Sequence, residues 1–285
     1  MTDNAAAAKG GAARHAKKTV LKILRYAVLT LIAAIFAGPF LWLLITSFRT
    51  GANLYDLNLL VGAYSLDNFV GVIKFMNIPQ YIVNTLIITV GAIAIDVVFS
   101  SLCAYPLAMM KFPGKKAVFG ILVALMIVPA AAGLVITYLT ITYMHLLNTF
   151  MGCILPCSVG AFSIILLRQA YFGIPKELMD AAKIDGAGEL KIWSRIMLPE
   201  IKPTVTTVII FDFIGNWNQF LWPVIIMQDP QKYPLATALQ YLNGMFNYKF
   251  GYIAAGTIIS IIPVILVFLC FQKNYIEAVA GAVKG

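Results

Sequence analysis

Residues 26–48, YAVLTLIAAIFAGPFLWLLITSF, decide the fold, because they form a run of 23 residues without a charged side chain. A helix needs about 20 apolar residues to cross the ~30 Å hydrocarbon core of a bilayer. The run is longer than the core of a secretory signal, about 7 to 15 residues, and no small-residue cleavage site follows it closely. We therefore interpret it as a retained first membrane span.

The composition of the whole chain agrees with a membrane protein. Of its 285 residues, 61% are hydrophobic and only 12% are charged, and the mean hydropathy is +0.86. An ordinary soluble domain carries about 25% charged residues, so that class is excluded. Residues 250–272 form a second uncharged run of 23 residues, and residues 117–167 form one of 51, long enough for two spans with a turn near residues 145–148.

Two further spans are each interrupted by a single acid, Asp96 or Asp212. The sequence thus predicts an all-α, polytopic membrane protein with six transmembrane helices. Residues 1–18, rich in Ala, Gly and Lys, are expected to be a disordered basic leader, and residues 19–285 to form one domain. The expected spans are 26–48, 82–108, 117–139, 150–170, 203–227 and 250–272.

The positive residues indicate the orientation. With both termini in the cytoplasm, 17 of the 21 Lys and Arg residues fall before the first span, in the cytoplasmic connections or in the tail. Positive residues beside spans are retained on the cytoplasmic side, so this orientation is the expected one. The net charge of +9 is explained in the same way, and a nucleic-acid partner is not expected.

Patterns that would indicate an enzyme or a metal site are missing from the sequence. The four cysteines fall in predicted spans and read as packing residues, so no metal site is expected. Gly114-Lys115 lacks the rest of a phosphate-binding loop, and no serine-hydrolase or zinc-protease motif occurs. The chain is expected to be no enzyme and to bind no cofactor, so any energy for its work comes from another chain.

A charged island, residues 173–202, lies between the fourth and fifth spans on the cytoplasmic side. The pattern predicts a short helix over 175–184, a bend at Asp185-Gly186 with Asp185 capping the next helix, and an amphipathic helix over 189–198 ended by Leu198-Pro199. It could be an interfacial helix resting on lipid headgroups. However, its Ala181-Ala182 face is too weakly apolar for that, and small residues permit close approach of another backbone. We therefore expect a docking surface for a cytoplasmic protein.

The stretch DAAKIDGAGELKIWSRIMLPEIKP, residues 180–203, resembles the signature loop of bacterial ABC importer permeases. That loop reads Glu-Ala-Ala, three residues, Gly, nine residues, Ile-x-Leu-Pro, and the spacing matches here with Asp180 in place of Glu. The stretches NWNQFLWP (216–223), YPLATALQ (233–240) and GAVKG (281–285) are similar to the carbohydrate-importer subgroup, in particular to the smaller permease of the maltose system.

The resemblance implies the type I permease fold of ABC importers, with loop 173–202 coupling to an ATP-binding subunit. Carried over by position, the coupling residues are Asp180, Ala181, Ala182, Asp185, Gly186, Leu198 and Pro199. The tail, residues 282–285, is also expected to reach the ATP-binding subunit.

The translocation path is expected along a polar stripe within the fifth span. Asp212, Asn216 and Gln219 share one helix face near Trp217, and a charge within a span is costly unless it meets a polar cavity or a partner. Amides, carboxylates and aromatic rings suit a sugar, but hydrogen bonds between helices explain the stripe equally well. Asn84 on the second span is a further candidate, whereas Asp96, with apolar neighbours, is expected to join helices.

The expected function is that of the permease subunit of an ATP-driven, binding-protein-dependent sugar importer in the bacterial inner membrane. The expected partners are a second homologous permease, two ATP-binding cassette subunits that hold ATP and Mg, an extracytoplasmic sugar-binding protein and the lipid bilayer. The alternative is a secondary sugar transporter driven by an ion gradient, with Asp96 and Asp212 as ion or proton sites. The sequence does not indicate which sugar is carried.

Overall fold

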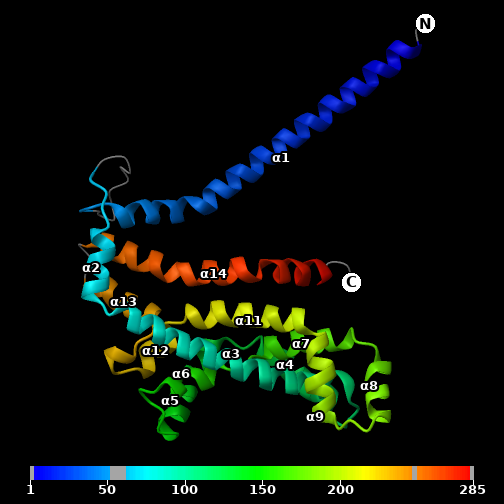
Figure 1. Cartoon of the computed structure of the whole chain (residues 1–285), viewed down its shortest axis with the longest axis vertical. Coiled ribbons are helices and arrows are strands. Elements are labelled where there is room, and N and C mark those ends of the chain that lie inside the picture. The colour runs from blue at the N-terminus through cyan, green and yellow to red at the C-terminus, as the bar shows by residue number, and fades with distance from the viewer. Residues whose placement is uncertain (1–2, 52–61, 246–248, 283–285) are drawn as a thin grey trace. The chain divides into compact units, whose positions relative to one another are not determined.

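The computed structural model describes residues 3–51, 62–245 and 249–282, and it divides into two compact units. Unit 1 comprises residues up to Val70 with Tyr248–Ile258, and unit 2 comprises Gly71–Asn247 with Ile259–Gly285. Figure 1 shows that the described elements are helices, apart from one isolated bridge between Arg49 and Tyr64. The C-terminal residues 283–285, expected to contact an ATP-binding subunit, lie outside the described residues.

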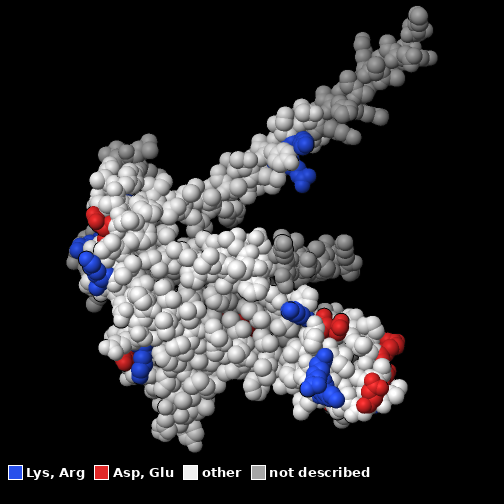
Figure 2. Space-filling view, in the orientation of Figure 1, with Lys and Arg blue, Asp and Glu red and all other residues white. Residues whose placement is uncertain are grey.

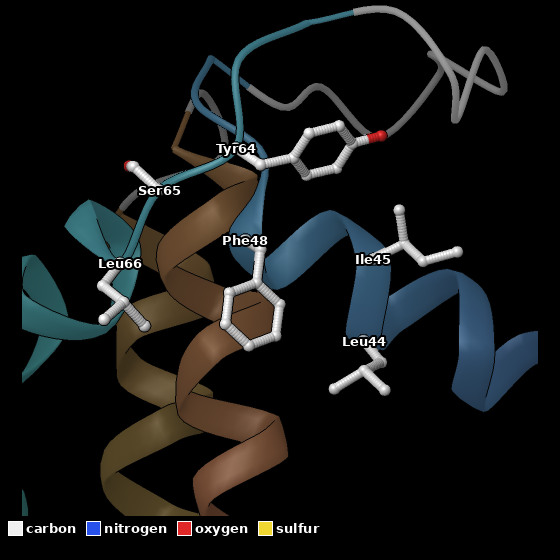
Figure 3. Close-up of a pocket in the computed structure, with 6 residues that line it drawn as sticks. All are labelled: Leu44, Ile45, Phe48, Tyr64, Ser65 and Leu66. Carbon is white, nitrogen blue, oxygen red and sulfur yellow. The ribbon is translucent and has the colours of Figure 1, made fainter.

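Unit 1 is built on α1, Asp3–Phe48, which continues back through the residues expected to form a disordered leader. Beyond the bridge, the buried Asn68 amide donates to the backbone carbonyls of Ser47 and Arg49, at 3.0 and 2.9 Å. Asn68 belongs to α2, Asp67–Phe75, so this amide fastens the end of α1 to the start of α2. An apolar hollow of about 450 Å³ lies beside this junction. Figure 3 shows the residues that line it: Leu44, Ile45, Phe48, Tyr64, Ser65 and Leu66.

Unit 2 is organised around α3, Ile78–Met109, an uninterrupted helix of 32 residues. Its buried positions are mostly small or hydroxylated, including Ala92, Ser100, Ser101 and Ala104. Such residues let neighbouring helix backbones approach closely in a membrane, where apolar surface is no driving force between helices. Helices α7, α11 and α6 accordingly pack along α3.

The other described elements of unit 2 are shorter helices, and some of the predicted spans correspond to two or more of them. Unit 2 also takes in parts of α2 and of α14, Phe250–Ala282, which belong to both units. In chain order the elements after α3 are α4 (Lys115–Leu125), η1 (Ala130–Gly133), α5 (Leu134–Tyr143), α6 (Phe150–Ile154), η2 (Leu155–Cys157), α7 (Ala161–Phe172), α8 (Lys176–Ile184), α9 (Glu189–Ile192), η3 (Trp193–Met197), α10 (Leu198–Glu200), α11 (Lys202–Trp217), α12 (Leu221–Ile226), η4 (Pro230–Lys232) and α13 (Leu235–Met245).

Proline and glycine break two of the predicted spans. The expected span 117–139 divides into α4 and α5, and an extended Pro129 precedes η1 between them. The expected span 150–170 bends by 49° between η2 and α7, next to Pro156 and an extended Gly160. Proline cannot donate a backbone hydrogen bond, which weakens a helix at that point, and at these two places the helix ends.

Three described helices are long and apolar enough to cross a membrane: residues 19–48, 78–109 and 250–272. The bent pair Phe150–Cys157 and Ala161–Phe172 makes a fourth if it counts as one span. An all-helical membrane protein is thereby confirmed. The count of six spans and the cytoplasmic position of both termini stay predictions.

Candidate functional site

The charged island folds into a compact helical loop at one end of unit 2. Residues 173–202 leave α7, run through α8, turn, and return through α9, η3 and α10 to α11. In Figure 1, α8 and α9 lie side by side at the end of unit 2 opposite α12 and α13. Figure 2 shows acidic and basic side chains gathered over this end, whereas the neighbouring surface over the long helices is almost free of charge. We call residues 173–202 the docking loop.

Gly186 makes the bend of the docking loop. Its φ is +75°, a left-handed conformation that costs other residues energy but suits glycine. The Gly186 N–H donates to the carbonyl of Lys183 at 3.0 Å, and the Ala187 N–H donates to that of Ala182 at 2.9 Å. These two bonds are the Schellman pattern that ends a helix. The bend is therefore where the sequence placed it, but Asp185 ends α8 and does not cap the next helix, because Gly188 is the N-cap of α9.

We expect Gly186→Ala to destabilise the docking loop by about 1 kcal/mol, because a Cβ makes the left-handed conformation costly. Nothing lies within 4 Å of that Cβ, so the penalty comes from the backbone alone. Hydrogen exchange of the α8 amides should accelerate in the variant. Gly120→Ala, in α4 and equally uncrowded, is the control and should leave the same amides unchanged. Equal exchange in both variants would contradict the role of Gly186.

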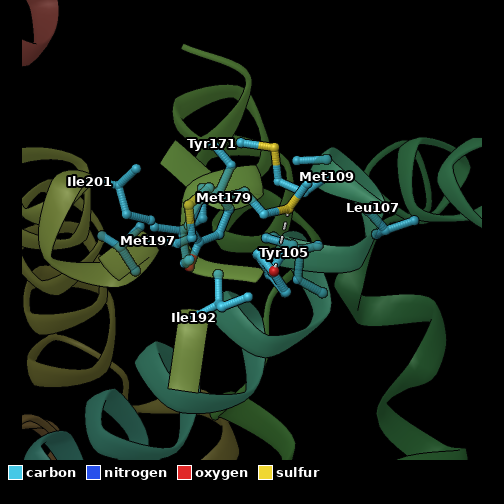
Figure 4. Close-up of a cluster of buried hydrophobic side chains, with 14 residues drawn as sticks. Tyr105, Leu107, Met109, Tyr171, Met179, Ile192, Met197 and Ile201 are labelled. Carbon is cyan, nitrogen blue, oxygen red and sulfur yellow. Dashed lines mark hydrogen bonds between the residues drawn. The ribbon is translucent and has the colours of Figure 1, made fainter. Parts of the chain in front are cut away.

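The inner face of the docking loop packs on the ends of the long helices. Met179 and Ala182 of α8 are buried, and Ala182 is only 6% exposed. The segment α9–η3–α10 is called the returning helix. Figure 4 shows Met179 beside Ile192 and Met197 of the returning helix and beside residues of α3 and α7. The full cluster is Ala104, Tyr105, Leu107, Ala108, Met109, Ile164, Leu167, Tyr171, Met179, Ala182, Ile192, Met197, Ile201 and Val208. The loop is thus part of the protein's own core.

The outer face of the docking loop presents apolar side chains to the outside. Ile184 is 87% exposed and Leu190 is 72% exposed, and Leu178 and Ala181 are exposed as well. The acids Asp180, on α8, and Asp185, its C-cap, are exposed as well. The two alanines of the motif therefore differ: Ala181 belongs to the outer face, and Ala182 is covered by the chain itself.

The returning helix contains a π-helical turn, η3, over Trp193–Met197. The sequence pattern predicted that Leu198-Pro199 ends this helix, but α10 continues through Pro199 to Glu200. Pro199 has no N–H to donate to the carbonyl of Arg195, so the normal hydrogen-bond ladder is interrupted at this turn. The wider π turn stands at the interruption, and such turns are frequent at functional sites.

One carboxylate joins the docking loop to α3. Glu189 Oε2 accepts a hydrogen bond from the Tyr105 hydroxyl at 2.7 Å, and Glu189 Oε1 forms a salt bridge with Lys183 Nζ at 2.8 Å. The Lys183 ammonium, together with the Tyr105 hydroxyl, holds the pKa of Glu189 below its ordinary value. The carboxylate therefore stays charged at neutral pH, and its contribution to stability is lost only as the pH falls through this lowered pKa. Neither Tyr105 nor Glu189 stood out in the sequence.

The polar stripe of the fifth predicted span lies on α11 and just beyond it. The Asn216 amide donates to the Asp212 carbonyl of its own helix at 3.0 Å, and the Gln219 amide lies 3.1 Å from the Cys157 sulfur. Trp217 is only 1% exposed and donates its indole N–H to the carbonyl of Ser260 at 3.0 Å. The structure thus places Trp217 and Gln219 at contacts with other elements of unit 2 and Asn216 against its own helix, and the part of the stripe in a translocation path stays a prediction.

Asp96 and Asn84 also connect helices. Asp96 is 2% exposed, and its Oδ1 accepts hydrogen bonds from the Ser100 hydroxyl and from the Gly160 N–H that precedes α7. The fully buried Asn84 amide donates to the carbonyls of Gln231 and Tyr233, at 2.8 and 3.0 Å. Both side chains therefore fasten α3 to distant parts of the chain. Within the described ranges, no three His, Cys, Asp or Glu side chains are grouped so that they could hold a metal ion.

Asn84 also borders a polar pocket at the end of unit 2 opposite the docking loop. The pocket has a volume of about 500 Å³. Its lining residues are Asn77, Gln80, Tyr81, Asn84, Phe150, Asp229, Gln231 and Lys232. The Gln80 amide donates to Asn84 Oδ1 at 3.0 Å, so these two side chains of the wall hold each other in place.

Comparison with known proteins identifies the family. The family model described as the binding-protein-dependent transport system inner membrane component matches residues 96–280. The melibiose/raffinose/stachyose import permease protein MelC of Bacillus subtilis is 31% identical over 266 residues, which cover 90% of this chain and 96% of that protein. The lactose transport system permease protein LacG of Rhizobium radiobacter is 29% identical over 262 residues, covering 92% and 96%.

The fold has a close counterpart among solved structures. A chain from a bacterial ABC transporter involved in the import of the acidic polysaccharide alginate matches with a TM-score of 0.79 at 23% identity, and the match covers 90% of this chain and 97% of that one. This likeness confirms the permease fold expected from the sequence. Because the family model spans well over half of its residues, the chain belongs to the binding-protein-dependent transport system inner membrane components, which are non-catalytic, multi-pass subunits of the bacterial inner membrane.

Proposed function

We propose that the chain is the permease subunit of an ATP-driven, binding-protein-dependent sugar importer and that its docking loop binds an ATP-binding subunit. The observation that carries the docking role is the division of the loop into two faces. Met179 and Ala182 pack inward, whereas Ala181 and Ile184, on the same short helix, stay uncovered. A soluble surface rarely leaves such apolar side chains together without a partner.

The relatives support sugar as the substrate class. Their names include lactose, arabinooligosaccharides and the group melibiose, raffinose and stachyose, so disaccharides and oligosaccharides are the proposed cargo. Within this chain, the polar pocket beside Asn84 combines amides, the Asp229 carboxylate and aromatic rings, the groups that suit sugar hydroxyls and ring faces. Asp212, Asn216, Trp217 and Gln219 remain the proposed path residues of α11 and the segment that follows it.

The proposed assembly contains this chain, a second homologous permease, two ATP-binding subunits that hold ATP and Mg, and a sugar-binding protein outside the membrane. The solved counterparts support partners of this kind: one is a bacterial alginate ABC transporter in complex with a pentasaccharide-bound periplasmic protein. The pairing of two different permeases and the number of each subunit are part of the proposal. In this assembly the permease hydrolyses nothing and bound ATP drives its conformational change.

We expect Ala181→Arg to abolish co-purification of the ATP-binding subunit from native membranes. Ala181 is exposed, so the arginine leaves the permease folded and blocks only the close approach of the partner. Affinity purification from detergent-solubilised membranes, with the ATPase activity of the eluate, measures this. Gln228→Arg places the same charge on an exposed position near the polar pocket and should retain the partner.

Two results would contradict the proposal. One is an Ala181→Arg protein that retains as much ATPase as the wild type. The other is sugar uptake by the wild type that survives ATP depletion but stops when the ion gradient is abolished. The second result would favour the ion-driven alternative with Asp96 and Asp212 as ion sites.

A further inference from the structure

We propose that Glu189 is a positioning residue that links the docking loop to α3 through Tyr105, so that movement of the docked loop is transmitted along this one helix. The inference rests on the proposed function, because it needs an ATP-binding subunit that moves the loop. It concerns two side chains outside the signature residues of the loop.

The Tyr105 hydroxyl, at the α3 end of the link, belongs to a side chain that is held in place by packing. Tyr105 lies near the end of α3, is only 3% exposed, and packs edge-on against Tyr171 of α7 with ring centroids 5.9 Å apart. A buried hydroxyl needs a hydrogen-bond partner, and here the partner is Glu189, which stands 84 positions further along the chain. Its second neighbour, Met179 Sδ at 3.7 Å, is a weak acceptor.

The Glu189 carboxylate, at the other end of the link, belongs to the docking loop, which is the part proposed to move. Glu189 is the first residue of α9, just beyond the Gly186 bend, and its carboxylate also binds Lys183 in the last turn of α8. Lys183 immediately precedes Ile184, one of the uncovered residues of the outer face. One carboxylate therefore connects the helix that faces the partner, the returning helix and α3.

The hydrogen bond between Tyr105 and Glu189 is a different type of interaction from the apolar packing around it. The surrounding cluster is apolar, and apolar contacts are non-directional, so they permit small sliding of one surface over another. A hydrogen bond to an ionised carboxylate is short, directional and about twice as strong as one between neutral groups. Displacement of α8 therefore acts on α3 directionally through this bond, in addition to the direct packing of Met179 against Tyr105.

Helix α3 carries the displacement to the opposite end of unit 2. From Tyr105 back to Asn84 it runs without a break for about 30 Å, at 1.5 Å per residue. At that end Asn84 holds the carbonyls of Gln231 and Tyr233 and forms part of the wall of the polar pocket. The same helix thus connects the docking loop with the pocket proposed for sugar.

The test compares Tyr105→Phe, Glu189→Gln and the double variant in the complete complex, reconstituted in proteoliposomes with its binding protein. We expect each variant to retain its ATP-binding subunit but to import about fivefold less sugar per ATP hydrolysed than the wild type, a typical coupling effect. Tyr105→Phe removes this bond, and Glu189→Gln replaces its ionised acceptor with a neutral amide and also removes the Lys183 salt bridge, so the double variant should be no worse than Glu189→Gln alone. Tyr143→Phe and Asp67→Asn, exposed positions outside the docking loop and the polar pocket, are the matched controls and should keep the wild-type ratio.

Three outcomes would overturn the link: an unchanged ratio of sugar to ATP, additive losses in the double variant, or loss of the ATP-binding subunit from the variant complexes. The third would make Glu189 part of docking alone. Failure of the proposed function is a separate result, seen as a wild-type complex that imports no sugar when ATP is supplied. Thermal stability of each variant complex, measured alongside, separates a lost link from an unfolded loop.

Discussion

Gly152→Ala is expected to prevent most of the protein from folding. A Cβ at this position would overlap with the carbonyl oxygen of Leu146, far inside any tolerated separation. The backbone of Leu146 cannot shift easily, because both of its polar groups are hydrogen-bonded. The Leu146 N–H donates to the carbonyl of Ile141, and the Leu146 carbonyl oxygen accepts the Thr149 hydroxyl at 2.7 Å. We expect a loss of about 3 kcal/mol or more, as for other overpacked interiors.

The same site anchors the next part of the chain, which adds to the expected effect. The Gly152 carbonyl accepts the buried Trp222 indole N–H at 3.0 Å, so a shift of the α6 backbone also breaks this bond to α12. The measurement is the yield of monodisperse protein after detergent extraction, together with its thermal midpoint. Gly215→Ala is the control, because nothing lies within 4 Å of its Cβ, and alanine is the better helix former in α11. A normal yield of Gly152→Ala would contradict the packing described here.

The turn beside Gly152 shows what the length of an uncharged run can predict about the positions of turns. A run of 51 residues required a turn, and its expected place, residues 145–148, is correct: His145 and Asn148 both adopt positive φ there. The run length was informative because a membrane helix must satisfy all its backbone hydrogen bonds internally, so the chain turns only beyond the span. It carried no information on breaks within a span, such as those at Pro129 and Gly160.

The docking loop shows a second limit of the sequence. The motif identified the loop, its glycine bend and the family, because these depend on local spacing. It could not separate Ala181 from Ala182, since which of two neighbouring alanines is covered depends on where α3 and α7 end in space. The bond between Tyr105 and Glu189 is likewise a product of tertiary structure, because its two residues stand 84 positions apart.

Trp217→Ala is expected to cost about 3–5 kcal/mol, the usual range for a buried tryptophan. Trp217 was predicted as a path residue, and the structure gives it extensive packing: it is 1% exposed and stacks on Phe213 with ring centroids 5.4 Å apart. Its indole N–H also binds the Ser260 carbonyl of α14 at 3.0 Å. Truncation therefore removes packing and a helix-to-helix hydrogen bond together, and the thermal midpoint of the purified protein should fall steeply.

Two companion variants separate a core role from a path role for Trp217. Trp217→Phe keeps a ring against Phe213 and loses mainly the hydrogen bond, so we expect a loss of about 1 kcal/mol. Phe220→Ala, at an exposed aromatic three positions further on, should leave stability nearly unchanged. If Trp217→Ala keeps the wild-type midpoint but abolishes sugar import, the indole contacts the cargo, and its packing against Phe213 and Ser260 is dispensable. If stability falls in the order wild type, Trp217→Phe, Trp217→Ala while the Phe variant still imports sugar, the indole holds α11 to α14 and the path is to be sought along other residues of the stripe.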